Sequence, residues 1–417
     1  MFPSIAARIV YMGLTFLAGV LLAAVALPHD FGSLSLIILN ATLFYTISAF
    51  GTESAIMLSI GKENWSVAKA TTGIAYTIIF QFILFALLQY VLSRSLNISL
   101  LTLKNTNLLA FEFIYFIGLM LVEKYTVLYY SFNRARVCNI LLSCTALVYL
   151  AIMVGLYLDW FRLEIHPFAV VANVTIFQGI ILMLAFHLKK GISFSNLMKR
   201  DWKAIFTVSL LVLACNLIQL VAYRFDYWFI ESTLSTSEVG IYAQANKFAQ
   251  LLWTLPNIVS FILIPKLIKQ ERMIDFVPFS NALNVTNVAI TGCVVVLCLF
   301  FYNYILPADY FDGLYLLLLM LPGYLLFACS IPIAALFFSK GLIKLNLYGS
   351  LLCLFLIVIL DIILIPQKGY WGAAMANLIA YSVCAFYFFI CFRKNAGLPL
   401  VSLLKLQFRF SSFNAFR

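Results

Sequence analysis

The chain has 417 residues, of which 64% are hydrophobic and 10% charged, and its formal net charge is +11. A mean hydropathy of +1.03 leaves little polar material for a water-facing shell, which excludes an ordinary soluble domain. The basic residues are dispersed among short gaps between apolar runs and form no continuous basic face, so the positive charge does not indicate nucleic-acid binding.

Apolar runs long enough to cross a bilayer recur along the whole chain. A spanning helix needs about 20 apolar residues, and several runs here are longer. Residues 351–360 are apolar on every side, whereas the strands of a membrane barrel alternate apolar and polar residues. We therefore predict an all-α polytopic membrane protein. Its twelve transmembrane helices are expected at 5–27, 34–60, 70–92, 107–131, 137–158, 167–188, 204–230, 239–265, 279–302, 313–338, 345–365 and 371–392.

The first span also has one feature of a cleaved signal peptide, because Ala24-Val25-Ala26 fits a small-residue cleavage site. It is too long for such a peptide, and Arg8 is the one basic residue before its apolar core. We therefore expect a transmembrane helix at this position.

The basic residues indicate the orientation of the chain. Twenty of the 27 Lys and Arg residues fall in every second gap between the spans, beginning at Arg8. The basic residues of the opposite gaps are Arg94, Lys104, Arg162 and Lys368. By the positive-inside rule the richer gaps face the cytoplasm, so both termini are expected there.

The nine cysteines all lie inside or at the edge of a predicted span. None pairs with another in an external loop, and their spacing does not match that of metal ligands. We expect them to be small apolar packing residues, with no disulfide framework, metal or other cofactor.

The chain resembles itself at an offset of 208 residues. Asp30-Phe31-Gly32 corresponds to Glu238-Val239-Gly240, and Tyr129-Tyr130-Ser131 corresponds to Phe337-Phe338-Ser339. Six spans in each half would make the halves parallel repeats, as in several secondary transporters whose substrate site lies between two lobes. Chance periodicity of a helical protein is the alternative. The predicted parts are an N-terminal six-helix lobe at 1–190, a cytoplasmic linker at 191–203, a C-terminal six-helix lobe at 204–392 and a cytoplasmic tail at 393–417.

Eight ionisable residues lie within the predicted spans. Their exposure to lipid, at about 2.5 to 3.5 kcal/mol each near a helix centre, would cost on the order of 20 kcal/mol. That exceeds a typical folding stability of about 5 to 15 kcal/mol. They are therefore expected to face a watery cavity, to pair with one another or to lie near the interface. These residues are Glu53, Glu112, Glu123, Lys124, Arg224, Asp226, Lys247 and Asp361.

Arg224 and Asp226 are expected about 30 Å along the seventh span, close to the outer surface. Because they are two residues apart, they point to different faces of the helix and do not neutralise each other along it. Their neighbours Tyr223, Tyr227 and Trp228 suggest an alternative, in which an interfacial aromatic belt anchors a snorkelling arginine.

The other charges differ in depth. Lys247 is expected about 12 Å below the outer end of its span, which favours a cavity position. Glu123 and Lys124 are adjacent and diverge by about 100° around the helix, so at least one of them should face inward. Glu53 and Asp361 are candidates for a proton or cation relay, and equally for hydrogen-bonded counter-ions.

Two stretches of the chain resemble a known family. The first runs from Arg224-x-Asp226 through Glu238-Val239-Gly240-Ile241-Tyr242-x-x-Ala245 to Pro265. The second is Ile365-Pro366-x-x-Gly369-x-x-Gly372-Ala373-Ala374-x-Ala376. They resemble the polysaccharide transporter family of the multidrug/oligosaccharidyl-lipid/polysaccharide (MOP) exporter superfamily, the Wzx-type O-antigen and capsule flippases. The similarity covers the whole chain in topology and is most specific over 222–272 and 361–380.

The resemblance implies a MATE/MOP-like fold, with two six-helix lobes around a cationic cavity that opens alternately to either side. The implied cargo is an oligosaccharide on undecaprenyl pyrophosphate, turned from the inner to the outer leaflet of the bacterial cytoplasmic membrane. The implied partners are this lipid-linked oligosaccharide, the bilayer, a coupling H⁺ or Na⁺, and a glycan polymerase with its chain-length regulator. No nucleic acid is expected.

A diphosphate carries about two negative charges, and its transfer through hydrocarbon requires counter-charge. The candidates for that counter-charge are Arg224, Lys247 and Lys124, of which arginine is best suited to bidentate phosphate contacts. The candidates for ion coupling are Glu53, Glu123, Asp226 and Asp361.

Two other functions compete with this one. A drug or cation exporter of the same superfamily would favour a negative cavity, and the spans hold three cations against five anions. A membrane glycan polymerase or glycosyltransferase would need catalytic residues on a large external loop. The gap at 93–106 offers Arg94 and Lys104, while His29 and His166 lack a nearby nucleophile or carboxylate constellation, so we do not expect an enzyme.

Overall fold

The structure is a computed structural model that describes residues 2–63, 65–102, 108–160, 166–191, 195–196, 199–269 and 276–397. The regular structure in these residues is helical. The chain divides into two compact units, Met1–Leu220 and Val221–Arg417. The predicted tail beyond residue 397, together with Lys104 and Arg162, lies outside the described residues.

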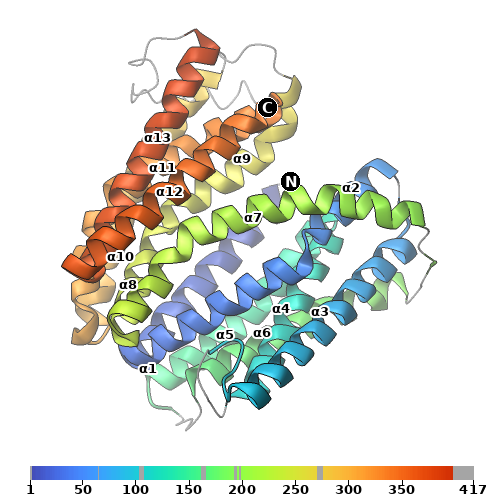
Figure 1. The fold of residues 1–417 in the computed structure, drawn as a ribbon, viewed down its shortest axis with the longest axis horizontal. Coiled ribbons are helices and arrows are strands. Elements are labelled where there is room, and N and C mark those ends of the chain that lie inside the picture. The colour runs from blue at the N-terminus through green and yellow to red at the C-terminus, as the bar shows by residue number, and fades with distance from the viewer. Residues whose placement is uncertain are drawn as a thin grey trace. The chain divides into compact units, whose positions relative to one another are not determined.

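Unit 1 is built around two long pairs of helices, in which α4 packs along α6 and α1 packs along α5 (Figure 1). Gly118 permits the first pairing, because a Cβ atom at this position would lie 2.5 Å from the backbone nitrogen of Ile176. The helices are α1 (Phe2–Ala49), α2 (Thr52–Glu63), α3 (Val67–Ser95), α4 (Leu109–Ser131), α5 (Ala135–Tyr157), α6 (Pro167–Lys190) and the greater part of α7 (Lys199–Thr233).

Unit 2 repeats this kind of packing. Its helix α11 packs along α13, and a Cβ atom at Gly323 would lie 2.8 Å from the Cα atom of Leu378. The offset of 208 residues recurs in one pair of helix starts, because α5 begins at Ala135 and α12 begins at Ile343. After the end of α7 the elements are α8 (Thr236–Ala249), α9 (Leu251–Lys269), α10 (Val277–Tyr304), the short 3₁₀ helix η2 (Ala308–Tyr310), α11 (Asp312–Ser339), α12 (Ile343–Lys368) and α13 (Tyr370–Ala396).

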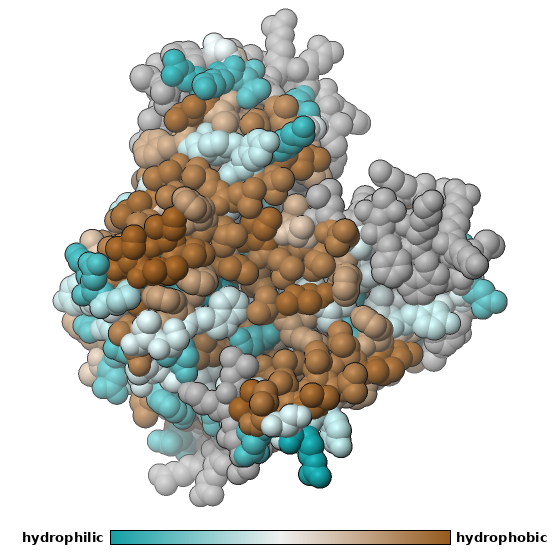
Figure 2. Space-filling view, viewed as in Figure 1, coloured by the Kyte–Doolittle hydropathy of each residue, from teal (hydrophilic) through white to brown (hydrophobic). Residues whose placement is uncertain are grey.

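Eight helices in the described part of the chain are long and apolar enough to cross a membrane: α1, α3, α5, α6, α10, α11, α12 and α13. On the face shown in Figure 2, apolar residues make up most of the visible surface. On α3, for example, Ile79, Phe80 and Ile83 are each more than half exposed. Such surfaces suit lipid, and the protein is a multi-pass membrane protein.

The chain turns sharply inside the second predicted span. Phe50 and Gly51 have φ values of 51° and 67°, and they separate the end of α1 from α2. A Cβ atom at Gly51 would lie 2.7 Å from the carbonyl oxygen of Ser209, so glycine serves both the left-handed backbone and the close contact. The prediction of one continuous helix at 34–60 is therefore wrong.

The predicted end of the first span at residue 27 agrees with the structure, because Leu27, with a φ of 59°, interrupts α1 just before Pro28, where the proline disfavours helical backbone. The predicted gap at 28–33 is helical. Three other boundaries differ from the sequence prediction. The predicted span at 239–265 consists of α8 and α9, which meet at Gln250. Helix α7 begins inside the predicted linker, and α13 continues past residue 392 to Ala396.

Candidate functional site

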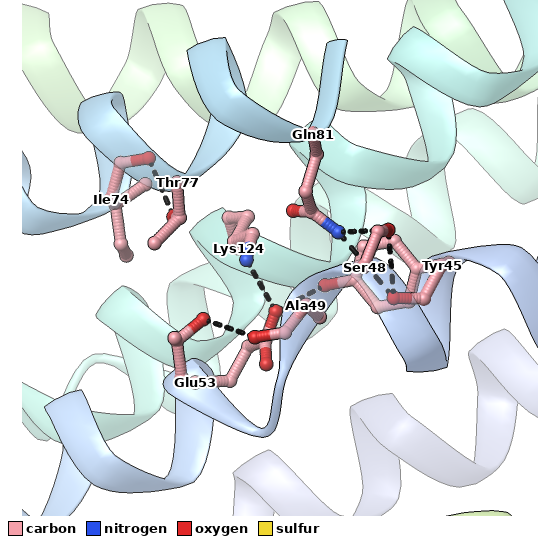
Figure 3. Close-up of polar contacts among 9 residues, drawn as sticks. Tyr45, Ser48, Ala49, Glu53, Ile74, Thr77, Gln81 and Lys124 are labelled. Atoms are coloured by element: carbon pink, nitrogen blue, oxygen red, sulfur yellow. Dashed lines mark hydrogen bonds and ion pairs between the residues drawn. The ribbon is translucent and has the colours of Figure 1, made fainter. Parts of the chain in front are cut away.

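A buried ion pair joins α2 to α4 in unit 1. The Lys124 Nζ atom lies 2.5 Å from the Glu53 Oε1 atom (Figure 3). The lysine side chain is 0% exposed and the glutamate side chain 16% exposed. The Tyr45 hydroxyl donates a hydrogen bond of 2.7 Å to the same carboxylate oxygen, and its ring centroid lies 5.6 Å from Nζ. Tyr45 therefore contacts both members of the pair.

The backbone turn at Gly51 places this carboxylate. Glu53 follows the turn in the first turn of α2, where the exposed N–H groups of the helix favour a negative charge. Tyr45 precedes the turn on α1, so the Tyr45–Glu53 hydrogen bond bridges the break between the two helices. Gln81 of α3 holds the end of α1 by donating 2.9 Å to the Ser48 hydroxyl (Figure 3).

Glu123 and Lys124 point in different directions, as their adjacency on α4 predicts. Lys124 lies inside unit 1, whereas the Glu123 side chain is exposed. Glu123 interacts electrostatically with Arg8 of α1 as well as with Glu53 and Lys124. Two cations and two carboxylates therefore balance each other in this part of unit 1.

Unit 2 contains a different arrangement, centred on the buried carboxylate of Asp226. The phenol of Tyr242 on α8 donates a hydrogen bond to one carboxylate oxygen, and Asn377 Nδ2 on α13 donates 3.2 Å to the same oxygen. The other oxygen accepts from the backbone N–H of Tyr227 at 2.9 Å. Asn377 also donates 2.5 Å to the Tyr242 hydroxyl, so three helices converge on this carboxylate.

Asp361 of α12 is a second buried carboxylate in the same unit. It is 1% exposed, and neither carboxylate oxygen has a hydrogen-bond partner among the described residues. Its charge interacts with that of Asp226, which is also attracted by Arg224. When both carboxylates are ionised, they leave one buried negative charge in excess over this cation, which is costly.

Arg224 donates its hydrogen bonds to atoms other than those that hold Asp226, as their two-residue spacing predicts, and the two charges attract each other. Its Nη1 atom donates 2.8 Å to the Tyr227 hydroxyl, and its Nη2 atom donates 3.2 Å to Gln250 Oε1. The guanidinium carbon lies 5.0 Å from the Tyr227 ring centroid. Two of the five guanidinium N–H groups are used in these bonds.

The aromatic neighbours of Arg224 pack within unit 2. Tyr227 is buried and packs edge-on against Tyr242 at 5.7 Å. Tyr223 is half-buried and contacts Trp253 and Tyr381 at ring-centroid distances of 5.2 and 6.3 Å. The interfacial aromatic belt stays an alternative prediction, with these contacts added to it.

The third candidate cation, Lys247, is half-buried in the last turn of α8. One residue earlier, Asn246 Oδ1 accepts a hydrogen bond of 2.5 Å from the Tyr324 hydroxyl. The Tyr324 ring stacks on Trp253 at 4.6 Å. Polar and aromatic groups therefore surround this end of α8. Lys124, the remaining candidate cation, lies in the other unit.

Glu112, another charge in a predicted span, has a structural role. Its carboxylate is fully buried and accepts hydrogen bonds from Gln89 Nε2 at 2.7 Å and Ser99 Oγ at 2.5 Å. Gln89 in turn accepts from the backbone N–H of Leu100 at 2.8 Å. These bonds attach the segment after α3 to the start of α4.

The two histidines predicted in external gaps have local partners. His29 lies 3.1 Å from Asp30, and His166 Nδ1 accepts 3.2 Å from the backbone N–H of Phe168, capping α6. Burial lowers the pKa of His166, which keeps it neutral and able to cap. His166 therefore caps a helix, and His29 forms a pair with Asp30 at the surface.

Sequence reasoning missed Tyr45, Tyr242, Asn246 and Asn377, which are uncharged. A usable signal was present in α8, where Tyr242 and Asn246 are four residues apart and therefore lie on one helix face. An amide and a phenol on the same face of an apolar span indicate a polar interior. Their partners on other helices could not be identified from spacing.

No family model and no curated protein sequence matches the chain. Solved structures do match it. The lipid II flippase MurJ in its inward closed conformation has a TM-score of 0.75 at 14% identity, over 100% of this chain and 92% of that one. An inward-facing MATE multidrug resistance transporter of the MOP superfamily has a TM-score of 0.66 at 14% identity, over 93% and 94% of the two chains.

A MOP superfamily transporter from Pyrococcus furiosus, described by a binding pocket of reverse polarity, has a TM-score of 0.54. It is 12% identical and the match covers 97% of this chain and 95% of that one. At such identities the likeness concerns the fold, and the proteins matched are transporters. The chain therefore has the fold that these transporters share.

Proposed function

We propose that the protein is a flippase that moves an oligosaccharide linked to undecaprenyl pyrophosphate across the bacterial cytoplasmic membrane by alternating access. The observation that carries this proposal is the match of the whole chain to a lipid II flippase with a TM-score of 0.75, against 0.66 and 0.54 for the other two transporters. The proposal includes twelve spans in two six-helix lobes, at 1–190 and 204–392, and both termini in the cytoplasm.

The charges within the helices support a phosphate-bearing cargo. A diphosphate needs counter-charge while it crosses the membrane, and a guanidinium can bind it through two parallel hydrogen bonds. Arg224 is half-buried and has N–H groups beyond the two that bind Tyr227 and Gln250. Arg224, Lys247 and Lys124 are thus the proposed cargo-binding cations. The polyprenyl tail of the cargo stays within the hydrocarbon of the bilayer throughout the movement.

The carboxylates supply the proposed ion coupling. Asp226 and Asp361 form the strongest candidate, because they are buried, interact with each other and outnumber the one cation, Arg224, that attracts Asp226. H⁺ or Na⁺ would complete this pair. Glu53 and Glu123 are the candidates in unit 1. A glycan polymerase and a chain-length regulator would act on the cargo once it reaches the outer leaflet.

Reconstituted transport tests the proposal. Proteoliposomes would carry a fluorescent oligosaccharide on undecaprenyl pyrophosphate, and a membrane-impermeant quencher would report which leaflet holds it. We expect movement by the wild type and a rate about tenfold or more lower for Arg224→Gln, since a hydrogen bond to a charged group contributes about 1.5 to 3 kcal/mol. The matched control is Arg94→Gln, which changes an exposed arginine at the end of α3.

A cation or drug exporter is the second candidate function. Two buried carboxylates, Asp226 and Asp361, against the one cation Arg224 favour it, because a buried negative site attracts a cation. Transport of organic cations by the same proteoliposomes, with no movement of the lipid-linked oligosaccharide, would establish the exporter and contradict the flippase.

A further inference from the structure

Glu53 covers the ammonium group of Lys124. The lysine side chain has no exposed surface, whereas 16% of the Glu53 side chain is exposed. Nζ and Oε1 are 2.5 Å apart, so the carboxylate occupies the position from which an anion would bind this lysine (Figure 3). Lys124 therefore binds a cargo phosphate only after Glu53 has been displaced.

Displacement of an ionised glutamate would be costly. It would leave a carboxylate without its cation and beside the phosphate of the cargo. Protonation removes this cost, because a neutral carboxyl group no longer competes for the ammonium and does not repel the incoming anion. The proton comes from water, and the ammonium remains paired with one anion before and after the exchange.

We propose that Glu53 is a proton-operated latch on Lys124: a phosphate-bearing headgroup binds the lysine by replacing Glu53, which takes up one proton as it leaves. The latch rests on the proposed function, for which it specifies how cargo enters unit 1. It assigns Lys124 to cargo binding and Glu53 to the coupling of that binding to protons.

Tyr45 is the positioning residue of the latch. Its hydroxyl donates 2.7 Å to the ionised Glu53, and its ring lies 5.6 Å from Nζ of Lys124. The ring attracts the ammonium whatever the charge of Glu53, so the lysine stays in place while its anion changes. Because Tyr45 and Glu53 lie on opposite sides of the break at Gly51, release of their hydrogen bond also frees α2 from the end of α1.

The surrounding charges agree with the exchange. Lys124 and Glu123 of α4 and Tyr45 of α1 interact electrostatically with Glu53, and Arg8 of α1 interacts with Glu123. With Glu53 ionised, the two cations and two carboxylates sum to zero. Protonation of Glu53 leaves one net positive charge, which offsets one of the roughly two negative charges of a bound diphosphate.

Calorimetric titration of the full-length protein in lipid nanodiscs tests the latch. The probes are farnesyl pyrophosphate and inorganic pyrophosphate, titrated at pH 6, 7 and 8 in buffers of different ionisation enthalpy. Wild type is expected to take up about one more proton per anion than Glu53→Gln. The affinity of the wild type relative to Glu53→Gln should then fall by up to about tenfold for each rise of one pH unit. Protonation changes of the probe itself are the same for wild type and Glu53→Gln, so they cancel when the two proteins are compared.

Three variants separate the latch from a structural effect. Glu53→Gln with Lys124→Gln removes both charges together and should lose at least tenfold in affinity relative to Glu53→Gln alone. Tyr45→Phe should shift the pH midpoint of binding upward by about one unit, because the ionised Glu53 loses a hydrogen-bond donor. Glu112→Gln changes a buried carboxylate elsewhere in unit 1 and should keep the proton uptake of the wild type.

The outcomes that overturn the latch differ from those that overturn the flippase. Equal proton uptake by wild type and Glu53→Gln would refute the latch and leave diphosphate binding intact. Binding of inorganic pyrophosphate without binding of farnesyl pyrophosphate would refute a lipid headgroup as the ligand. If none of the proteins binds either probe and no lipid-linked oligosaccharide moves in proteoliposomes, the proposed function itself fails.

Discussion

The two units bury charge in opposite ways. In unit 1, Lys124 and Glu53 form a direct ion pair at 2.5 Å. In unit 2, Asp226 and Asp361 are both buried carboxylates, and Asp361 has no hydrogen-bond partner within the described part of the chain. The first arrangement is neutral by itself, whereas the second places two carboxylates against one cation, Arg224. Under the two proposals above, an anion opens the first site and a proton or cation completes the second.

Removal of the lysine should have the largest effect. Lys124→Met leaves Glu53 as an uncompensated carboxylate, and we expect the free energy of unfolding to fall by about 3 to 5 kcal/mol. Addition of Glu53→Gln should recover most of that loss. The measurement is thermal or denaturant unfolding of the purified protein. The matched variant in unit 2 is Asp361→Asn, which should lose no stability; an equal loss there would remove the contrast between the units.

The dependence of stability on cations should be the next largest difference between the units. Na⁺ should stabilise the wild type by about 2.7 kcal/mol at one hundred times its dissociation constant, because the folded carboxylate pair binds it and the unfolded chain does not. H⁺ should stabilise it by less, because the carboxylates of the unfolded chain also bind protons. Asp226→Asn and Asp361→Asn should abolish this stabilisation, and Glu112→Gln should retain it. Melting temperatures over a range of Na⁺ concentrations and pH values provide the measurement. An unchanged cation response in both aspartate variants would place the coupling outside unit 2.

The glycine contacts should show where the units behave alike. Gly118→Ala and Gly323→Ala each place a Cβ atom against the backbone of a neighbouring helix, at 2.5 and 2.8 Å, and should cost about 1 to 3 kcal/mol. Gly292→Ala is the control, because no atom lies within 4 Å of its Cβ position, and it should gain about 0.5 to 1 kcal/mol. Unfolding measurements on the three variants test this. Tolerance of alanine at Gly118 alone would mean that only unit 2 depends on close helix packing.

Loss of a single phenol hydroxyl should have an effect no larger than that of the glycine substitutions, and a different one in each unit. Tyr242→Phe removes a donor to the buried carboxylate of Asp226 and should cost about 1 to 3 kcal/mol. Tyr45→Phe should cost about 0.5 to 1.5 kcal/mol, since Lys124 still holds Glu53. Both substitutions preserve the ring, so unfolding free energies report the hydroxyl. A larger loss for Tyr45→Phe would show that the tyrosine, more than the lysine, holds Glu53.

Part of this site could be predicted from the residues alone. Charges in apolar spans are costly wherever the helices lie, so Lys124, Asp226 and Asp361 could be selected before any fold was known. The partners could not be selected in this way. Lys124 and Glu53 are 71 residues apart, and Asn377 and Asp226 are 151 residues apart. Their meeting depends on which helices pack together.

The sequence by itself determined the helical, membrane-spanning character of this protein, because hydrophobicity adds up locally along each segment. It also determined that Arg224 and Asp226 point to different helix faces, since that follows from helix geometry. Only the tertiary structure decided that Lys124 is held by Glu53, while Asp361 accepts no hydrogen bond from the described residues. Such pairings follow from helix packing and from the backbone turn at Gly51, which are properties of the folded chain as a whole.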